Sequence, residues 1–422
     1  MKFTCPFAFV SLFILPYANA QSTDVTDIQN KLNMLQAQID ALQVELKNAR
    51  AEEEKTPEVQ QKSVETKKQD GINIGGAVRT NYSHTSYNDG NKNRGGDFDF
   101  DLLRINFAGE IGDISLNAEI RFFDYMTAVK YAYLGYQLDE NWQAQLGITK
   151  VPFGNWPYNS HSYFFGTTYY VGLEDDYDLG VLLKRTTRDN WQLDLGFFKN
   201  DELGGVDGYV EDTFDRYSYD IVGIRSSSEG IYAQPGQAVG EYNTFAGRYA
   251  YHIPLKYGDT EIGMSILAGG LHDGQHRAGN YRAWAAHINS HIGQWNVQLQ
   301  HGQYRYDIDD TVKQIAVGAY AFFDTMAAEA TMTNVNVAYT YDQKLGPISS
   351  IQFYNDFGII YDKSDSTTNT WMNVSGLSIS AGGVFTYIDL VHAQNQPFIG
   401  GSIAGDSNET ERRLNINIGY YF

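Results

Sequence analysis

From Gly71 to the end of the chain, apolar and polar side chains alternate in a long series of segments of roughly ten residues each. In the last segment, "LNINIGYYF", the residues Leu414, Ile416, Ile418, Tyr420 and Phe422 share one face of a strand, and the intervening positions are mostly polar. One such strand would also suit a half-buried soluble sheet. A long series of them favours a transmembrane β-barrel.

Short turn-like segments separate these strands and allow them to be counted. They fall at residues 110–113, 139–141, 187–190, 256–259, 291–294, 343–347 and 381–383. In a bacterial barrel the short turns and both chain ends lie on the periplasmic side, so seven returns imply sixteen strands.

Two alternating segments, 217–225 and 313–322, remain after this count. If both crossed the membrane, the barrel would have eighteen strands, but its short turns would no longer share one side. We therefore assign them to long outer loops or to strand extensions above the membrane. The predicted fold is all-β, a transmembrane antiparallel barrel of about sixteen strands, with eighteen as the alternative.

Three tryptophans, Trp142, Trp191 and Trp295, each follow a turn and precede a leucine on the same face four residues later. This repeated position predicts an aromatic girdle, because indole rings prefer the depth of the lipid headgroups. The alternative is a set of core tryptophans in a soluble β-sandwich. Tyr420 and Phe422 in the last strand similarly resemble a C-terminal signal for the barrel assembly machinery.

The N-terminal region predicts three further segments. Residues 1–20 have the apolar run and small-residue end of a signal peptide. Residues 21–50 carry apolar side chains at alternating spacings of four and three, which predicts a short periplasmic coiled-coil helix, or else a lone amphipathic helix. Residues 51–70 are charged and predict a flexible linker, so the outer-membrane β-barrel pore spans residues 71–422.

Composition excludes several classes of protein. The chain has 31 basic and 51 acidic residues, and its net charge of −20 argues against a nucleic-acid partner. Its one cysteine, Cys5, lies in the predicted signal peptide, so neither a disulfide nor a cysteine metal site is expected. Motifs of known catalytic or cofactor sites do not stand out, and we expect a protein that is not an enzyme and has no cofactor and no metal site.

Several stretches, in this order, resemble the phosphate-selective porin O and P family of Gram-negative outer membranes. They are "LLRINFAGEIG" from 102, "AYLGYQL" from 132, "LGITKVPFG" from 146, "SIQFYNDFGIIYDK" from 350 and "TYIDLVHAQNQPFIGG" from 386. The resemblance implies a sixteen-stranded, water-filled channel that forms a trimer behind a periplasmic coiled coil. It also implies that the loop after "KVPFG" folds inward and narrows the pore.

Strand phasing places six basic side chains on the inward face. Since neighbours such as Val78 and Thr80 point outward, the residue between them points in. The same reasoning gives the full set of candidate pore-lining residues: Arg79, Arg104, Arg121, Lys184, Arg248 and Arg413. They could form a stripe that attracts anions. Alternatively, they pair with inward acids such as Glu119 or lie at a rim beside lipid phosphates.

Residues 151–176 are too long for a simple hairpin and form the candidate constriction loop. We expect its aromatic side chains to pack against the barrel wall, with a sugar path as the alternative. The candidate residues at its two ends, which could set the local electric field, are Lys150, Pro152, Phe153, Gly154, Glu174, Asp175 and Asp176.

The segments 174–178, 201–215 and 307–310 together contain thirteen acids and no Lys or Arg. Placed in outer loops, they predict an acidic channel mouth that would oppose phosphate selectivity. Alternatively, they solvate the surface and bind divalent cations that bridge lipopolysaccharide.

These observations predict an outer-membrane porin that lets small hydrophilic solutes and ions diffuse passively, with anions such as phosphate among the candidates. The alternatives are a carbohydrate or organic-acid channel and a non-conducting structural or adhesive barrel. The expected partners are outer-membrane lipid, lipopolysaccharide, the barrel assembly machinery and two further copies in a homotrimer.

Overall fold

The computed structural model describes residues 70–185, 190–204, 215–309, 311–342 and 344–422. The predicted signal peptide, coiled coil and linker fall on residues 1–69, apart from Asp70, and so lie outside the described residues. Within the described part, no helix is both long and apolar enough to cross a membrane.

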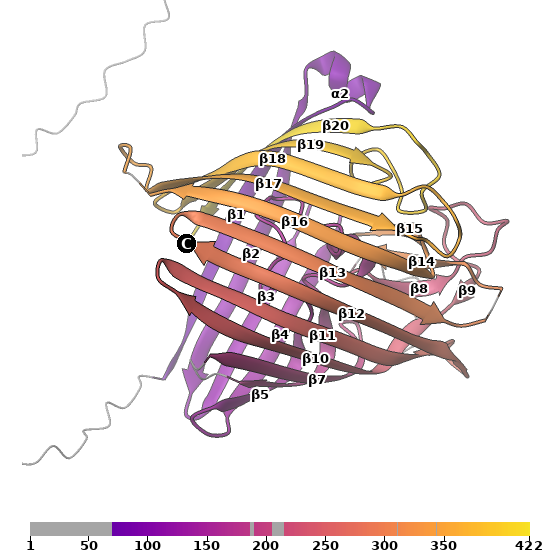
Figure 1. Cartoon of the computed structure of the whole chain (residues 1–422), viewed down its shortest axis with the longest axis horizontal. Helices are drawn as coiled ribbons and strands as arrows, with labels where there is room; N and C mark the ends of the chain where they lie inside the picture. The colour runs from indigo at the N-terminus through magenta and orange to yellow at the C-terminus, as the bar shows by residue number, and fades with distance from the viewer. Residues whose placement is uncertain (1–69, 186–189, 205–214, 310, 343) are drawn as a thin grey trace, which may run out of the picture. The chain divides into compact units, whose positions relative to one another are not determined.

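Sixteen antiparallel strands form one closed barrel (Figure 1). Each strand pairs with the next one along the chain, except that β7 pairs with β10 and β13 pairs with β16. The first eight are β1 (Gly71–Thr85), β2 (Asp97–Ile111), β3 (Ile114–Phe122), β4 (Thr127–Gln137), β5 (Trp142–Lys150), β6 (Tyr177–Arg185), β7 (Trp191–Asp201) and β10 (Gly240–Leu255). The other eight are β11 (Gly258–His272), β12 (Arg277–Ile292), β13 (Trp295–Asp307), β16 (Glu329–Tyr341), β17 (Ser350–Tyr361), β18 (Thr370–Ala381), β19 (Val384–Gln394) and β20 (Glu411–Tyr421). The predicted count of sixteen is confirmed.

The last strand closes the barrel by pairing with the first. β20 runs antiparallel to β1, with Ala77 opposite Tyr421 and Thr85 opposite Arg413. Phe422 continues the ladder, since its N–H donates to the Gly76 carbonyl at 3.1 Å and its carbonyl accepts from the Gly76 N–H at 2.9 Å. A closed sheet leaves no unpaired edge, which is the condition for crossing a membrane with strands.

Each of the seven predicted turns joins two neighbouring strands of the barrel. Gly112 and Gly293 stand in two of them with φ of 60°. Two-residue hairpin loops of this kind need positive φ, which glycine adopts without steric cost. The turns therefore follow from local sequence, and this is why they could be counted before the fold was known.

The alternation of side chains is realised as an apolar outer face and a polar inner face. Ile74 and Phe245 are 67% and 63% exposed, whereas Asp194 and Asn415 are buried inside. An outer band of exposed apolar side chains is what a lipid-facing barrel wall requires.

The two segments left over from the strand count form a separate small sheet. Its strands are β8 (Asp220–Ile224), β9 (Gln237–Ala238), β14 (Gln314–Ala319) and β15 (Phe322–Ala327), in the order β15, β14, β8, β9. They belong to the connections β7–β10 and β13–β16, at the end of the barrel opposite the short turns (Figure 1). These strands do not enter the barrel wall, so the alternative of eighteen spanning strands is wrong.

Two short helical segments complete the fold. The helix α2 (Asp89–Arg94) lies between β1 and β2, and its N-cap Asn88 accepts a hydrogen bond from the Asn91 N–H. The 3-10 turn η1 (Tyr169–Val171) lies in the long connection between β5 and β6.

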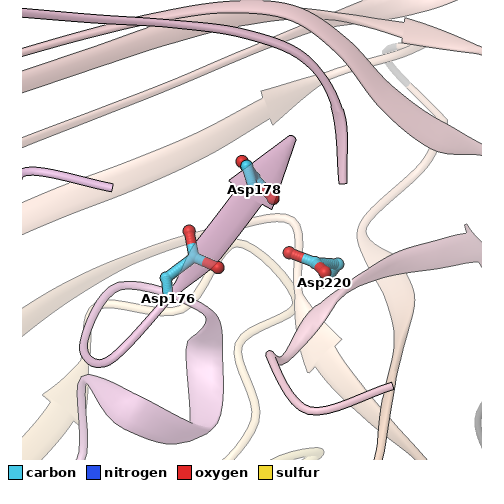
Figure 2. Close-up of side chains that lie close together, drawn as sticks. All are labelled: Asp176, Asp178 and Asp220. Carbon is cyan, nitrogen blue, oxygen red and sulfur yellow. The ribbon is translucent and has the colours of Figure 1, made fainter. Parts of the chain in front are cut away.

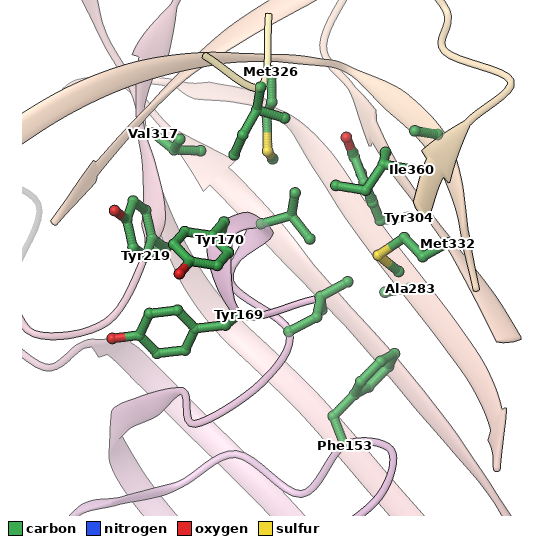
Figure 3. Close-up of a cluster of buried hydrophobic side chains, with 14 of the residues drawn as sticks. Phe153, Tyr169, Tyr170, Tyr219, Ala283, Tyr304, Val317, Met326, Met332 and Ile360 are labelled. Carbon is green, nitrogen blue, oxygen red and sulfur yellow. The ribbon is translucent and has the colours of Figure 1, made fainter. Parts of the chain in front are cut away.

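A hydrophobic cluster joins this long connection to the small sheet (Figure 3). Tyr169 and Tyr170 of η1 pack there with Tyr219, and Val317 and Met326 come from β14 and β15. The small sheet is apolar because it packs on the inside of the barrel's loop end, where lipid does not reach it. The strands β8 and β14 are accordingly buried on both faces.

Candidate functional site

The connection from Val151 to Asp176, hereafter the inward loop, lies inside the barrel. Its first part is bonded to three strands of the wall: the Gly154 N–H donates to Ser265 Oγ at 2.9 Å, and the Asn155 N–H donates to Gln300 Oε1 at 2.7 Å. Further on, Asn336 Nδ2 donates to the Asn159 carbonyl at 2.7 Å. The loop is thereby held against β11, β13 and β16.

The middle of the inward loop reaches other strands. The N–H groups of His161 and Ser162 donate to Asp356 Oδ2 of β17 at 2.7 and 2.8 Å. The Tyr163 hydroxyl donates to Asp101 Oδ1 of β2 at 3.0 Å. Because β17 and β2 are well separated around the barrel, the loop crosses the lumen and divides it.

The two ends of the inward loop are joined by one buried carboxylate. Asp175 accepts from Lys130 Nζ at 2.6 Å and from Lys150 Nζ at 2.9 Å. The hydroxyls of Tyr177 and Tyr217 donate to the same carboxylate at 3.1 and 2.8 Å. Lys130 belongs to β4, so this network fastens the loop to the wall.

On the side of β20, β1, β2 and β3, the inward loop and the wall enclose a cavity of about 320 Å³. Four of the six predicted inward bases line it, one from each of these consecutive strands: Arg413, Arg79, Arg104 and Arg121. We call these four residues the arginine wall. Their close grouping is a result of strand order, since β20 and β1 are neighbours only in the closed barrel.

The partners of the arginine wall are unequal. Arg79 Nε lies 2.8 Å from Asp101 Oδ2. Arg121 and Arg104 both pair with Glu119, at 2.7 and 3.7 Å. Pairing with this acid is the alternative to an unpaired stripe of bases that the sequence left open. Arg413 instead donates to Asn415 Oδ1 and to the Phe398 carbonyl, which are neutral oxygens. The four guanidinium groups of the arginine wall therefore carry more positive charge than Asp101 and Glu119 neutralise.

The other two predicted bases lie on the far side of the inward loop, away from the cavity. Lys184 Nζ and the Arg248 guanidinium lie 4.8 and 5.7 Å from the centre of the Trp156 ring. Arg248 Nε also donates to the Gly154 carbonyl at 2.7 Å. Both residues face inward, but their contacts serve to hold the loop.

The loop residues singled out from the sequence lie at the two ends of the inward loop. Phe153 packs in the hydrophobic cluster, and Glu174 accepts from the Asn159 N–H and from Thr168 Oγ1. The residues that face the cavity come from the middle of the loop instead, and sequence reasoning missed them: Tyr158, Ser160, His161, Ser162, Tyr163, Phe164, Phe165, Tyr169 and Tyr170. Sequence reasoning did not single them out because no local sequence pattern fixes the orientation of side chains in a long, mostly irregular connection.

The cavity has further tyrosine rings that sequence reasoning also missed: Tyr125, Tyr320, Tyr387 and Tyr421. The Tyr421 ring lies 5.3 Å below the Arg104 guanidinium, and Tyr163 lies 5.5 Å from that of Arg79. Strand phasing could have found Tyr421, since it shares the inward face with Arg413. The cavity thus combines guanidinium groups with aromatic faces.

The expected acidic mouth is wrong for the described acids of residues 174–178 and 201–202. Glu174, Asp175, Asp176, Asp178, Asp201 and Glu202 are all buried. Asp175 pairs with two lysines, and Asp201 and Glu202 pair with the buried Arg216 at 3.0 and 3.3 Å. The paired acids are buried because basic side chains from β4, β5 and the β7–β8 connection form ion pairs with them: Lys130, Lys150 and Arg216.

The predicted girdle tryptophans, Trp142, Trp191 and Trp295, are the first residues of β5, β7 and β13. All three therefore stand beside short turns, at one end of the barrel, and Trp295 is 52% exposed. Tyr420 and Phe422 are likewise exposed on the outer face. Their contact with lipid headgroups and with assembly machinery stays a prediction.

Comparison with known proteins agrees with this geometry. Residues 72–211 match a family model described as phosphate-selective porin O and P. Among curated proteins, no sequence matches the chain.

Several solved structures share the fold. The outer membrane channel DcaP of Acinetobacter baumannii has 12% identity and a TM-score of 0.53, covering 83% of this chain and 97% of that one. An anion-selective porin from Comamonas acidovorans has 9% identity and a TM-score of 0.51, covering 84% and 100%. OmpT of Vibrio cholerae has 11% identity and a TM-score of 0.50, covering 83% and 97%.

At these identities the solved structures establish the fold alone, and the family match covers the first part of the barrel. The closed sixteen-stranded barrel with its inward loop therefore has the fold of these outer-membrane channels, and its residues 72–211 resemble the phosphate-selective porin O and P family.

Proposed function

We propose that this barrel is an outer-membrane porin and that it passes small hydrophilic anions through the space between the inward loop and the arginine wall. The observation that carries the proposal is that the arginine wall has more guanidinium groups than carboxylate partners. Four guanidinium groups face the cavity, while Asp101 and Glu119 are the two carboxylates bonded to them. A surplus of fixed positive charge in a narrow passage attracts anions and repels cations.

Two comparisons support the same sign of selectivity. The matched family is described as phosphate-selective, and one structural neighbour is described as anion-selective. The burial of the described acids of residues 174–178 and 201–202 also takes away part of the acidic mouth that would have opposed anion entry.

A second candidate is an organic-acid channel. The tyrosine rings of the cavity offer apolar faces beside the guanidinium groups, as at Arg104 and Tyr421. A carboxylate with an apolar body would satisfy both kinds of surface, whereas phosphate would use only the guanidinium groups.

The test is the reversal potential of the purified porin in a planar lipid bilayer under a KCl gradient. We expect discrete conductance steps and a potential of the sign given by chloride preference. Arg413→Gln should move the potential toward cation preference, because it removes the guanidinium that has neutral partners. Arg412→Gln is the matched control, since it removes the same charge from the outward face of the same strand.

Absence of conductance steps would rule out a channel. A cation-selective wild type, or an equal shift in both variants, would rule out the arginine wall as the selectivity element. Competition by phosphate or by an aromatic carboxylate for the chloride current would then distinguish the two candidate solutes.

We also propose that the porin assembles as a trimer through the predicted coiled coil of residues 21–50, ahead of the linker that ends near Asp70. The heptad spacing of residues 28–49 supports this. Light scattering of the mature protein in detergent, with and without residues 21–50, should show a trimer that is weakened by the deletion. An unchanged mass would place the trimer contacts in the barrel instead.

A further inference from the structure

Three carboxylates meet at the junction of the inward loop, the barrel wall and the small sheet (Figure 2). They belong to Asp176, the last residue of the inward loop, to Asp178 of β6 and to Asp220 of β8. One oxygen of each lies within 4.8 Å of the others. Their residues are only 7%, 3% and 3% exposed.

The surroundings add more negative charge than they neutralise. Asp201, Glu202 and Glu241 are also buried and act electrostatically on Asp176 or Asp220. Among the described residues, Arg216 is the base that forms ion pairs with this group, namely with Asp201, Glu202 and Asp220. Six carboxylates with one guanidinium have a formal charge of −5 when all are ionised.

Such a group cannot stay ionised inside a protein without a compensating charge, because the desolvation of each carboxylate costs several kcal/mol. The sequence between residues 201 and 215 supplies no Lys or Arg. Since Arg216 is the base that forms ion pairs with these carboxylates in the described part of the chain, bound protons or a bound cation would supply the remaining positive charge.

The hydrogen bonding favours the cation. The Oδ1 atoms of Asp176 and Asp178 are both buried, and neither has a hydrogen-bond partner among the described residues. Figure 2 shows the three carboxylates turned toward a common space. Buried polar atoms are nearly always bonded, so two unbonded carboxylate oxygens that face one space point to a ligand between them.

We propose that Asp176, Asp178 and Asp220 bind one Ca²⁺ ion, which fastens the inward loop and the small sheet to the barrel wall. The donors are all oxygens, which suits a hard cation. Ca²⁺ binds oxygens at about 2.3–2.6 Å, so two of its ligands stand up to about 5 Å apart, as these do. Mg²⁺ needs shorter bonds and a near-ideal octahedron, and binds here more weakly.

The ion joins elements far apart in the chain. Without it, three repelling carboxylates meet at the junction, and β8 loosens from β6. The small sheet and η1 share one hydrophobic cluster, so this loosening reaches the inward loop and the passage beside it. Calcium therefore acts as a structural ion that keeps the passage in one conformation.

The test is calorimetric titration of CaCl₂ into the full mature porin after removal of metal with EDTA. We expect one site per chain in the wild type and no binding at that site in Asp178→Asn or in Asp220→Asn. Asp113→Asn, which alters an exposed acid in the β2–β3 turn, is the control and should bind as the wild type does.

Hydrogen exchange of residues 215–225 provides a second measurement, which requires only that the barrel of each variant is folded. Calcium should slow this exchange in the wild type and in Asp113→Asn, and should have no effect in the two site variants. A wild type that neither binds calcium nor changes its exchange would overturn the proposal, as would site variants that keep both responses. These outcomes do not depend on anion selectivity, which the reversal potential tests separately.

Discussion

Replacing Asp175 by Asn tests whether the buried charge network holds the inward loop in the lumen. The carboxylate lies between the ammonium groups of Lys130 and Lys150, at 2.6 and 2.9 Å. Both Asp175 and Lys130 are buried, so removing the carboxylate leaves two ammonium groups without their counter-charge. Breaking a buried pair in this way costs about 3–5 kcal/mol.

The loss applies to the docking of the loop, since the ladder of the barrel is untouched. The tyrosine hydroxyls of Tyr177 and Tyr217 can still bond the new amide, so we expect the lower value, about 3 kcal/mol. Because each 1.4 kcal/mol is a factor of ten, local opening of residues 151–176 should become roughly a hundredfold more frequent.

The assay is hydrogen exchange of residues 151–176 in the folded barrel at fixed calcium, with single-channel recordings in parallel. Exchange should rise by that factor, and the open-channel current should become noisier. Glu140→Gln is the control, since it removes an exposed acid from the β4–β5 turn.

A double variant sharpens the result. Lys130→Met added to Asp175→Asn removes one of the two uncompensated charges, so its effect on exchange should be smaller than the sum of the single effects. Unchanged exchange in Asp175→Asn, or strict additivity in the double variant, would refute the reasoning.

Three further predictions concern the loop, the small sheet and the seam of the barrel. Gly154→Ala should loosen the inward loop by about 2–3 kcal/mol, because Gly154 has φ of 63° and a Cβ would overlap Gln300 Oε1; proteolysis of the loop should accelerate, whereas Gly247→Ala, with ordinary contacts for a Cβ, should not change it. Burial raises the pKa of Asp324 in β15 from 3.8 to about 7, so the docking of Ser402 and Ile403 on it is strongest below the lower value and is lost as pH rises to about 7; the protection of residues 395–404 from hydrogen exchange, measured relative to the intrinsic rate at each pH, should fall over this range, and Asp324→Asn should abolish that fall, a persistent fall counting against the prediction. Deleting Phe422 removes both of its bonds to Gly76 at the seam; the yield of inserted barrel should fall, while channels that do form should keep the wild-type conductance, and a normal yield would contradict this.

The strand pattern was predictable because it is local. The period of two in segments such as residues 414–422 and the glycine turns at Gly112 and Gly293 depend on neighbours along the chain. The inward direction of Arg79 and Arg413 follows from the same period. Their gathering into one wall, however, needs the pairing of β20 with β1, which are the last and the first strand of the barrel along the chain.

The inward loop shows where local reasoning stops. Its length and its position after β5 marked it as a separate element, but the residues that face the cavity, such as Tyr158 and Tyr163, could not be chosen. Tyr163 is held by Asp101 of β2, 62 positions away, and His161 is held by Asp356 of β17, 195 positions away.

By itself, the sequence determined that this protein is a sixteen-stranded membrane barrel with inward arginines, because alternation and turn length are properties of short segments. Only the tertiary structure decided what its acids do. From the sequence, Asp175, Asp178 and Asp201 are expected to be exposed to water, because burying an unpaired carboxylate is costly. Lys130 and Arg216 reach two of them only after the chain has folded, and the space left at the third is what the proposed calcium ion fills.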